Sequence, residues 1–145
     1  MTLDEQLEIV RRNRGKLKDT VDLVRASLDK LQPYDENRVY NADELEPYDA
    51  LSDRFIRAVE VGLKFFRSYE MLEFAEQSDT LRNLLNRMEK TGMVSSVEIW
   101  FRMRDVRNRI VHDYLPQEVK DMYDDIMGAF SCELIRSVEK VKDAL

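Results

Sequence analysis

Apolar residues recur along most of the chain at alternating steps of three and four positions, which is the spacing of an amphipathic helix. The first such segment begins after Thr2, which together with Glu5 has the capping-box spacing of a helix start. We expect this helix to end before Pro33, because the residue before a proline avoids the helical region. Its apolar positions are Leu3, Leu7, Val10, Leu17, Val21, Val24, Leu28 and Leu31.

Residues 34–46 are polar and show no apolar repeat, so they are predicted to form the one substantial loop. Pro47 suits a first helical turn and is predicted to open a second helix that runs to about Ala75. The apolar stripe of this helix, residues 51–72, is wider than that of a surface helix, which predicts burial on two sides. Gly62 costs a helix interior about 1 kcal/mol relative to alanine, so it either marks a close helix approach or is simply tolerated.

A short helix and a long final helix are expected in the second half of the chain. Ser78 or Asp79 can cap the short helix, and Gly92 is expected to end it in a left-handed conformation. Its apolar residues are Leu81, Leu84, Leu85 and Met88. The final helix follows Pro116 as one element, with the apolar residues Val119, Met122, Ile126, Phe130, Leu134, Val138 and Val141.

The helix between these two carries the candidate chemistry. Ser95 and Glu98 have the capping-box spacing and predict its start. It is expected to reach Tyr114, because the dipeptide Leu115-Pro116 breaks the helical repeat. Its expected core line is Ile99, Met103, Val106 and Ile110.

Composition supports a helical fold. Only four Gly and three Pro interrupt 145 residues, of which 36% are charged and 43% are hydrophobic. Four long helices and one short helix with short connections predict an all-α fold, an up-and-down four-helix bundle with an extra short helix. Residues 1–145 are expected to form a single domain, since a chain of this length can bury a core of its own.

Charge and cysteine content narrow the functional classes. The net charge of −6 argues against broad nonspecific nucleic-acid binding, which needs a basic surface. Cys132 is the only cysteine, and no apolar run reaches the length of a membrane span, about 18 residues. The N-terminus has the pattern of a charged amphipathic helix and not of a secretory signal, so a reduced, cytoplasmic setting is expected.

Metal and cofactor sites are not indicated. One His and one Cys cannot form a transition-metal constellation. The acidic stretch "KDMYDDI", residues 120–126, is more typical of a solvated helix face than of a magnesium site. The sequence also has no glycine-rich phosphate loop and no serine-nucleophile motif, so no cofactor is expected.

Four arginines lie within eight residues of an otherwise acidic chain, at Arg102, Arg104, Arg107 and Arg109. A guanidinium group forms paired hydrogen bonds with a phosphate, so this cluster is a candidate anion site. The alternative is a solvated helix face on which Glu98 and Asp105 balance the charge.

The stretch "RNRIVHDY", residues 107–114, contains the only histidine of the chain, His112. On a straight helix Arg107 and His112 are about 140° apart, so one helix does not aim both at one small target. They converge if the arginine side chain wraps round the helix, or if two copies of the helix face each other in a symmetric dimer. The wide stripe of residues 51–72 also calls for a second helical surface, so a homodimer is expected.

Histidine and arginine together suit RNA cleavage without a metal. An imidazole exchanges protons at neutral pH, and a guanidinium stabilises the charge that accumulates on phosphoryl oxygens. Taken alone, an isolated histidine near a helix end is more often structural or merely exposed. The residues themselves therefore leave both interpretations of His112 open.

The motif formed by Arg107, four residues, His112, one residue and Tyr114 resembles the signature of the HEPN superfamily, specifically of the HepT-like toxins of HepT/MntA toxin–antitoxin pairs. Asn108 matches the polar residue that commonly follows the family arginine. The similarity covers residues 80–126, with a short helix, a Lys-Thr-Gly turn and a tryptophan before the motif. The first 75 residues fit only in the order and length of their helices.

The resemblance implies a HEPN-like bundle that acts as a metal-independent endoribonuclease on RNA, usually as a homodimer whose two motif helices border a cleft. Arg107 and His112 match the catalytic pair, and Asn108, Arg104 and Arg109 are the expected supporting residues. Tyr114 matches the tyrosine that is AMPylated by the cognate minimal nucleotidyltransferase (MNT) antitoxin. If the helix continues to Tyr114, this side chain lies on nearly the same face as Arg107 and opens into the cleft. The alternative is that Tyr114 only packs against the last helix after the turn at Leu115-Pro116.

Relatives on the same bundle leave an alternative open, a non-catalytic subunit that binds the substrate of a nucleotidyltransferase. The intact pair of Arg107 and His112 favours the enzyme, whereas the net charge of −6 favours the binding subunit. A plain helical scaffold is a third possibility, but it leaves the motif unexplained. Fold alone does not separate these functions.

Overall fold

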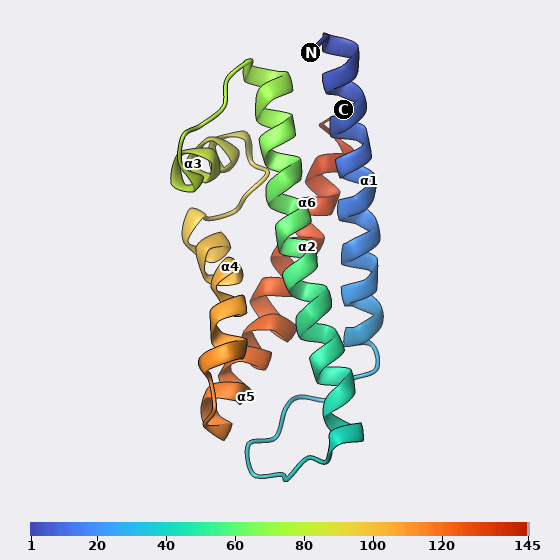
Figure 1. Ribbon diagram of the computed structural model, residues 1–145, viewed down its shortest axis with the longest axis vertical. Helices are drawn as coiled ribbons and strands as arrows, with labels where there is room; N and C mark the ends of the chain where they lie inside the picture. Colours follow the sequence, from blue (N-terminus) through green and yellow to red (C-terminus); the bar gives the residue numbers. More distant parts are fainter. Residues whose placement is uncertain (145) are drawn as a thin grey trace.

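The helices of the chain run alternately up and down one long axis (Figure 1). The computed structural model describes residues 1–144, and within them every regular element is helical. The elements are α1 (Leu3–Leu28), α2 (Ala42–Phe74), α3 (Leu81–Thr91), α4 (Val97–His112), α5 (Pro116–Asp125), η1 (Ile126–Phe130) and α6 (Ser131–Lys142). The predicted all-α bundle is confirmed.

Helix α2 is the central element of the bundle. It runs through the middle of the view in Figure 1, with α1 along one side, α4 along the other and α6 behind. Helix α3 lies beside the end of α2 at which both chain termini are found. Because α2 is packed from several directions, its prediction as a helix buried on two sides is confirmed.

Trp100 of α4 packs directly against Gly62 of α2. A Cβ atom added at Gly62 would lie 3.0 Å from Cη2 of Trp100, whose side chain is fully buried. Of the two explanations that the sequence left open for this glycine, the structure shows the close helix approach, and a larger residue there would push the indole away. The wide apolar stripe of α2 is covered by α1, α4 and α6 of the same chain, so it does not require a second copy.

Helix α2 begins at Ala42, so the prediction that the loop extends to residue 46 is wrong. Asn41 accepts a hydrogen bond from the Glu44 backbone N–H at 2.9 Å, and the Glu44 carboxylate accepts one from the Asn41 N–H at 3.1 Å. This reciprocal capping box satisfies two backbone donors and starts the helix earlier. Pro47 consequently lies in the second turn of α2 and not in the first.

The loop before α2 is held by tyrosines, a feature that its polar composition conceals. The ring of Tyr34 stacks on Tyr40 at 4.8 Å and on Tyr123 at 5.5 Å between centroids. The Tyr48 hydroxyl donates to the Gln32 carbonyl at 2.6 Å, and burial raises the pKa of Tyr48 to about 12. The phenol therefore stays protonated at neutral pH and keeps donating this bond.

A buried glutamate explains where α3 begins. Glu70 of α2 is fully buried and accepts a hydrogen bond from the Ser78 backbone N–H at 2.8 Å. Ser78 also donates its hydroxyl to the same carboxylate, so it is not free to cap a helix. Thr80 caps α3 by accepting from the Asn83 N–H at 3.1 Å, and the predicted caps Ser78 and Asp79 are wrong. The predicted end is confirmed, because Gly92 follows α3 with φ +85°.

A second buried glutamate fixes the start of α4. Glu133 of α6 accepts from the Ser95 backbone N–H at 3.0 Å, from the Ser95 hydroxyl at 2.6 Å and from the Trp100 indole N–H at 2.7 Å. Ser96 caps α4 instead, accepting from the Ile99 N–H at 3.4 Å, so the predicted cap Ser95 is wrong. Glu133 thereby joins α6 to the first turn of α4.

The final helix is bent, which corrects its prediction as one uninterrupted element. Helices α5 and α6 are joined by η1, in which Gly128 has the non-helical angles φ −107° and ψ −111°. A glycine adopts such angles at little steric cost. The bend lies three residues after Asp125, which contacts Arg102 and Arg109 of α4.

We predict that Glu133→Ala lowers the free energy of unfolding by about 3 kcal/mol, because it leaves buried donors of Trp100 and Ser95 without an acceptor. Glu139→Ala is the matched control, since Glu139 is an exposed glutamate of the same helix and, within residues 1–144, pairs only with Lys142. The control should stay within about 0.5 kcal/mol of the wild type. Urea denaturation followed by circular dichroism measures both, and equal effects of the two substitutions would contradict the role of Glu133.

Candidate functional site

The packing of Trp100 decides which face of α4 points outward. The buried residues of α4 are Val97, Trp100, Met103 and Val106. Met103 and Val106 belong to the predicted core line, but Ile99 is only half-buried and Ile110 is exposed. The buried face of α4 is therefore rotated toward Trp100, which is not part of the predicted core line. The rotation leaves the arginines of α4 on the surface.

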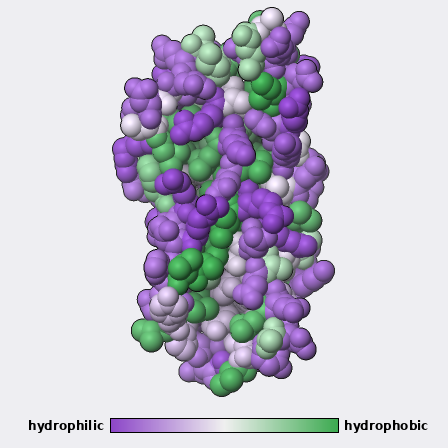
Figure 2. Space-filling model, in the orientation of Figure 1, coloured by the Kyte–Doolittle hydropathy of each residue, from purple (hydrophilic) through white to green (hydrophobic). Residues whose placement is uncertain are grey.

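A groove of about 480 Å³ lies between α2 and α4. Figure 2 shows a band of hydrophobic surface along the seam between these helices, bordered by hydrophilic residues. The residues that line the groove are Ile56, Val59 and Glu60 of α2 and Phe101, Arg102, Met103, Arg104, Asp105, Arg107 and Asn108 of α4. It thus combines an apolar floor with three arginines, Arg102, Arg104 and Arg107.

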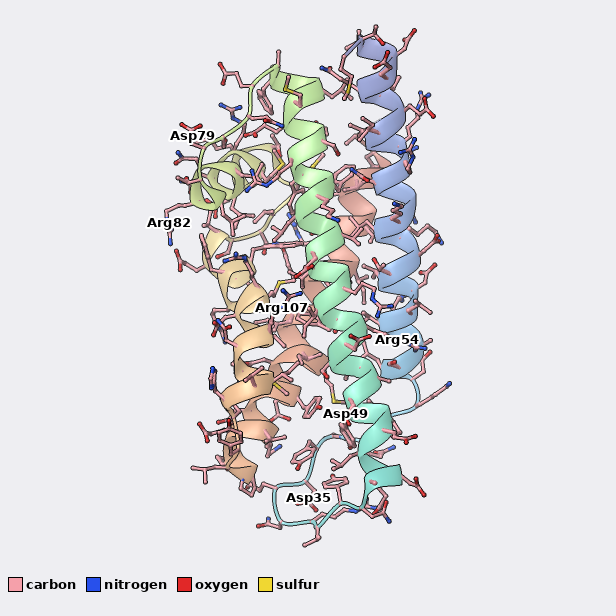
Figure 3. The ribbon with its side chains drawn as sticks, in the orientation of Figure 1. Asp35, Asp49, Arg54, Asp79, Arg82 and Arg107 are labelled. Atoms are coloured by element: carbon pink, nitrogen blue, oxygen red, sulfur yellow. The ribbon has the colours of Figure 1, made fainter. Side chains whose placement is uncertain are left out.

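Arg107 crosses the groove from α4. It is labelled in Figure 3, where its side chain lies between α4 and α2. Its guanidinium forms an ion pair with the carboxylate of Glu60 on α2. The side chains of Arg107 and Glu60 remain 62% and 50% exposed, so both can be reached from solvent.

Arg109 points away from the groove and joins α4 to α5. Its Nη1 atom donates to Asp125 at 2.9 Å and its Nε atom to Asp113 at 3.3 Å. Burial lowers the pKa of the Arg109 guanidinium, but the hydrogen bonds with the two carboxylates outweigh this effect and raise the pKa above its usual value. Arg109 therefore keeps its charge and fixes the end of α4, and it does not line the groove.

The remaining groove residues differ in how firmly they are held. The Asn108 amide donates to Asp105 at 2.9 Å. Arg102 lies 3.6 Å from Asp125 and stacks over the ring of Phe130 at 5.3 Å. Arg104 has no carboxylate oxygen within 4.0 Å among residues 1–144. Arg104 is thus the groove arginine that is most available to an anion.

His112 and Tyr114 lie beyond the groove. Helix α4 ends at His112, and Asp113 has the extended angles φ −84° and ψ 103°. The expectation that the helix reaches Tyr114 is wrong, and so is the position on the Arg107 face inferred from it. The side chain of Tyr114 is 77% exposed, so it does not pack against the last helix either.

Sequence reasoning missed two features of this site. Glu60 carried no signal, because it belongs to another helix and only the fold brings it to Arg107. The second feature is a run of exposed apolar side chains around His112, formed by Ile110, Val111, Tyr114 and Leu115. Exposed apolar residues this close together are typical of a surface that another molecule covers, and the run could have been read from the sequence.

Residues 1–144 contain neither a candidate metal site nor a helix that could span a membrane. No group of three or more His, Cys, Asp or Glu side chains within residues 1–144 is arranged to hold a metal ion. Across the same residues, none of the helices combines the length and apolar character of a membrane-spanning segment.

We predict that Arg109→Ala lowers the free energy of unfolding by about 1–2 kcal/mol, because the 23% exposed guanidinium compensates two carboxylates. Arg104→Ala removes the same charge from the same helix without breaking an ion pair, and it should change stability by less than about 0.5 kcal/mol. Hydrogen exchange should also become faster at the last turn of α4 in the Arg109 variant alone. Indistinguishable unfolding curves for the two variants would rule out this anchoring role.

Comparison with known proteins assigns the chain to a family. Residues 19–143, from the middle of α1 to the end of α6, match the family described as "Nucleotidyltransferase substrate binding protein like". No curated protein and no solved structure matches the chain. The match covers all of α2, α3 and α4 and hence the whole groove. The chain therefore belongs to this HEPN-like family, the HepT-type partners of minimal nucleotidyltransferases.

Proposed function

We propose that the protein is a metal-independent endoribonuclease toxin that an MNT-type nucleotidyltransferase partner neutralises by AMPylation. The observation that carries this proposal is that Arg107, Asn108 and His112 are all exposed on the last two turns of α4 and contribute nothing to the core. Exposed residues of these types, next to a groove with three arginines, are better explained by chemistry than by packing.

In the proposed reaction, His112 takes the proton from a ribose 2′-hydroxyl, whose oxygen then attacks the neighbouring phosphorus. The bond from phosphorus to the 5′-oxygen breaks, and that oxygen receives a proton as it leaves. Arg107 stabilises the negative charge that accumulates on the phosphoryl oxygens. The products are a 2′,3′-cyclic phosphate and a 5′-hydroxyl, and no redox partner is needed.

The proposed active site requires two copies of the chain. Within one chain Arg107 lines the groove and His112 does not, because they lie on different faces of α4. A second copy packed on Ile110, Val111 and Leu115 would cover these exposed side chains. It would also bring its own His112 toward the neighbouring Arg107. We therefore propose a symmetric homodimer with a composite site.

The second candidate function is a non-catalytic subunit that binds the substrate of a nucleotidyltransferase. The description of the family favours it, as does the net charge of −6. The ion pair between Arg107 and Glu60 adds to this case, because it lowers the charge available to RNA. A cleavage assay separates the two functions, since the binding subunit leaves RNA intact.

We predict that His112→Ala and Arg107→Ala each abolish RNA cleavage and relieve growth arrest while leaving the melting temperature nearly unchanged, since both side chains are exposed. Wild-type cleavage should persist in EDTA and leave 2′,3′-cyclic phosphate ends. Mixing the two inactive variants should restore part of the activity, because a mixed dimer contains one site with both residues intact.

Loss of wild-type activity on chelation, or full activity of His112→Ala, would refute the ribonuclease assignment. A mixture that stays inactive while both variants remain dimeric by light scattering would refute the composite site. A wild-type protein that is monomeric at micromolar concentration would refute the dimer itself.

We predict that the partner attaches AMP to Tyr114. Among the six tyrosines this is the exposed one, since the other five are buried or half-buried. In this step the phenol oxygen attacks the α-phosphorus of ATP and pyrophosphate leaves, so the protein gains one adenylyl group. The bulky anion beside His112 would then oppose the binding of RNA.

Co-expression with the nucleotidyltransferase, followed by intact-mass spectrometry, measures the modification. Tyr114→Phe should gain no adenylyl mass and should stay toxic. Tyr34→Phe is the control, because Tyr34 is half-buried in the tyrosine cluster, and it should be modified like the wild type. Modification of Tyr114→Phe to the wild-type extent would disprove the assignment.

A further inference from the structure

The carboxylate of Glu60 pairs with the Arg107 guanidinium, the group that binds a phosphate in the proposed function. We propose that Glu60 is a built-in competitor for phosphate at Arg107, so that RNA must displace this carboxylate before it is bound productively. The inference rests on the proposed function and adds to it a residue that sets the threshold for substrate binding. It is drawn from the cross-helix ion pair between Glu60 and Arg107 and from the shape of the groove.

The geometry around Glu60 is fixed by the fold. Glu60 lies on α2 only two residues before Gly62, against which the buried indole of Trp100 of α4 packs. Both helix backbones are therefore held firmly at this level. The carboxylate is presented across the groove to Arg107, and both residues belong to the groove lining.

The neighbours of Glu60 on its own helix do not engage it. Lys64 lies one turn further along α2, at the spacing of an intrahelical ion pair, but it lines a different groove. Arg57, on the preceding turn, pairs with Asp53 at 2.7 Å. The Glu60 carboxylate is thus directed to Arg107, the arginine that binds the phosphoryl oxygens in the proposed reaction.

Carboxylate and phosphate oxygens compete for the same guanidinium. Each accepts paired N–H bonds from an arginine, and one Arg107 side chain cannot offer its fork to both at once. A displaced Glu60 would also remain in the groove and repel the incoming phosphate. Because the pair is half-exposed and exposed ion pairs are weak, the competition should lower RNA affinity several-fold without abolishing binding.

A positioning role is the main alternative for Glu60, and it has the opposite signature. If Glu60 only oriented Arg107 for catalysis, its removal would lower kcat and leave the affinity for RNA unchanged. If Glu60 competes with phosphate, its removal raises the affinity. The direction of the effect therefore separates the two roles.

The test compares Glu60→Gln with Glu98→Gln in the full-length protein. Glu98 is the matched control, because it also forms an exposed ion pair between helices, at 3.0 Å to Arg82, but lies outside the groove. Both substitutions remove one negative charge, so nonspecific electrostatics are the same. Binding is measured by fluorescence anisotropy with an uncleavable 2′-O-methyl oligoribonucleotide, and by NMR titration of arginine side-chain signals with inorganic phosphate.

Glu60→Gln should bind both probes about two- to fivefold more tightly than the wild type, and Glu98→Gln should bind both like the wild type. Most of the gain should be lost when Arg107→Ala is added to Glu60→Gln, because the competition acts through this arginine and only the repulsion by the Glu60 charge remains.

Equal affinities of Glu60→Gln and Glu98→Gln would overturn the inference, and so would a lower cleavage rate of Glu60→Gln at unchanged affinity. Tighter phosphate binding by Glu60→Gln in a protein that cleaves no RNA would support the competition while rejecting the ribonuclease. The failure of the inference and that of the proposed function are therefore distinguishable.

Discussion

The contact of Trp100 with Gly62 is the constraint on which the rest of the site depends. The indole lies against the one position of α2 that has no side chain, and its N–H is held by the buried carboxylate of Glu133. This arrangement fixes the rotation of α4 about its own axis, since a fully buried indole has no second place to pack. Arg107 is turned toward α2 as a result, and Glu60 faces it across the groove.

Within residues 1–144, three of the four arginines of α4 form ion pairs with carboxylates. Glu60 pairs with Arg107, and Asp125 contacts both Arg102 and Arg109. An acidic chain can present arginines in this way without creating a strongly basic surface, which limits nonspecific attraction to nucleic acid. At Arg107 an anion must replace the Glu60 carboxylate, which is a local event within the groove. Arginines that are paired in this way fit both candidate functions, the ribonuclease and the binding subunit.

The end of α4 separates the groove from the surface at which a partner would act. Arg109 ties this end to α5, and the extended backbone of Asp113 turns the chain outward after His112. Tyr114 is exposed on the turn that follows, among apolar neighbours. The bend at Gly128 lies three residues after Asp125, the residue that pairs with Arg109. The groove and the turn are thus two adjacent regions with different chemistry, joined by one ion-pair network.

The sequence alone determined the order of the helices, the stop at Gly92 and the placement of Arg107 and His112 on one helix. These features depend on local periodicity and on single residues whose conformational preferences act at short range. The tertiary structure decided the rest. Ser95 is drawn from its capping role by Glu133, 38 residues away, and α2 supplies Glu60 to the motif. The choice among such partners is made by burial and by hydrogen bonds between distant segments, which no local pattern contains.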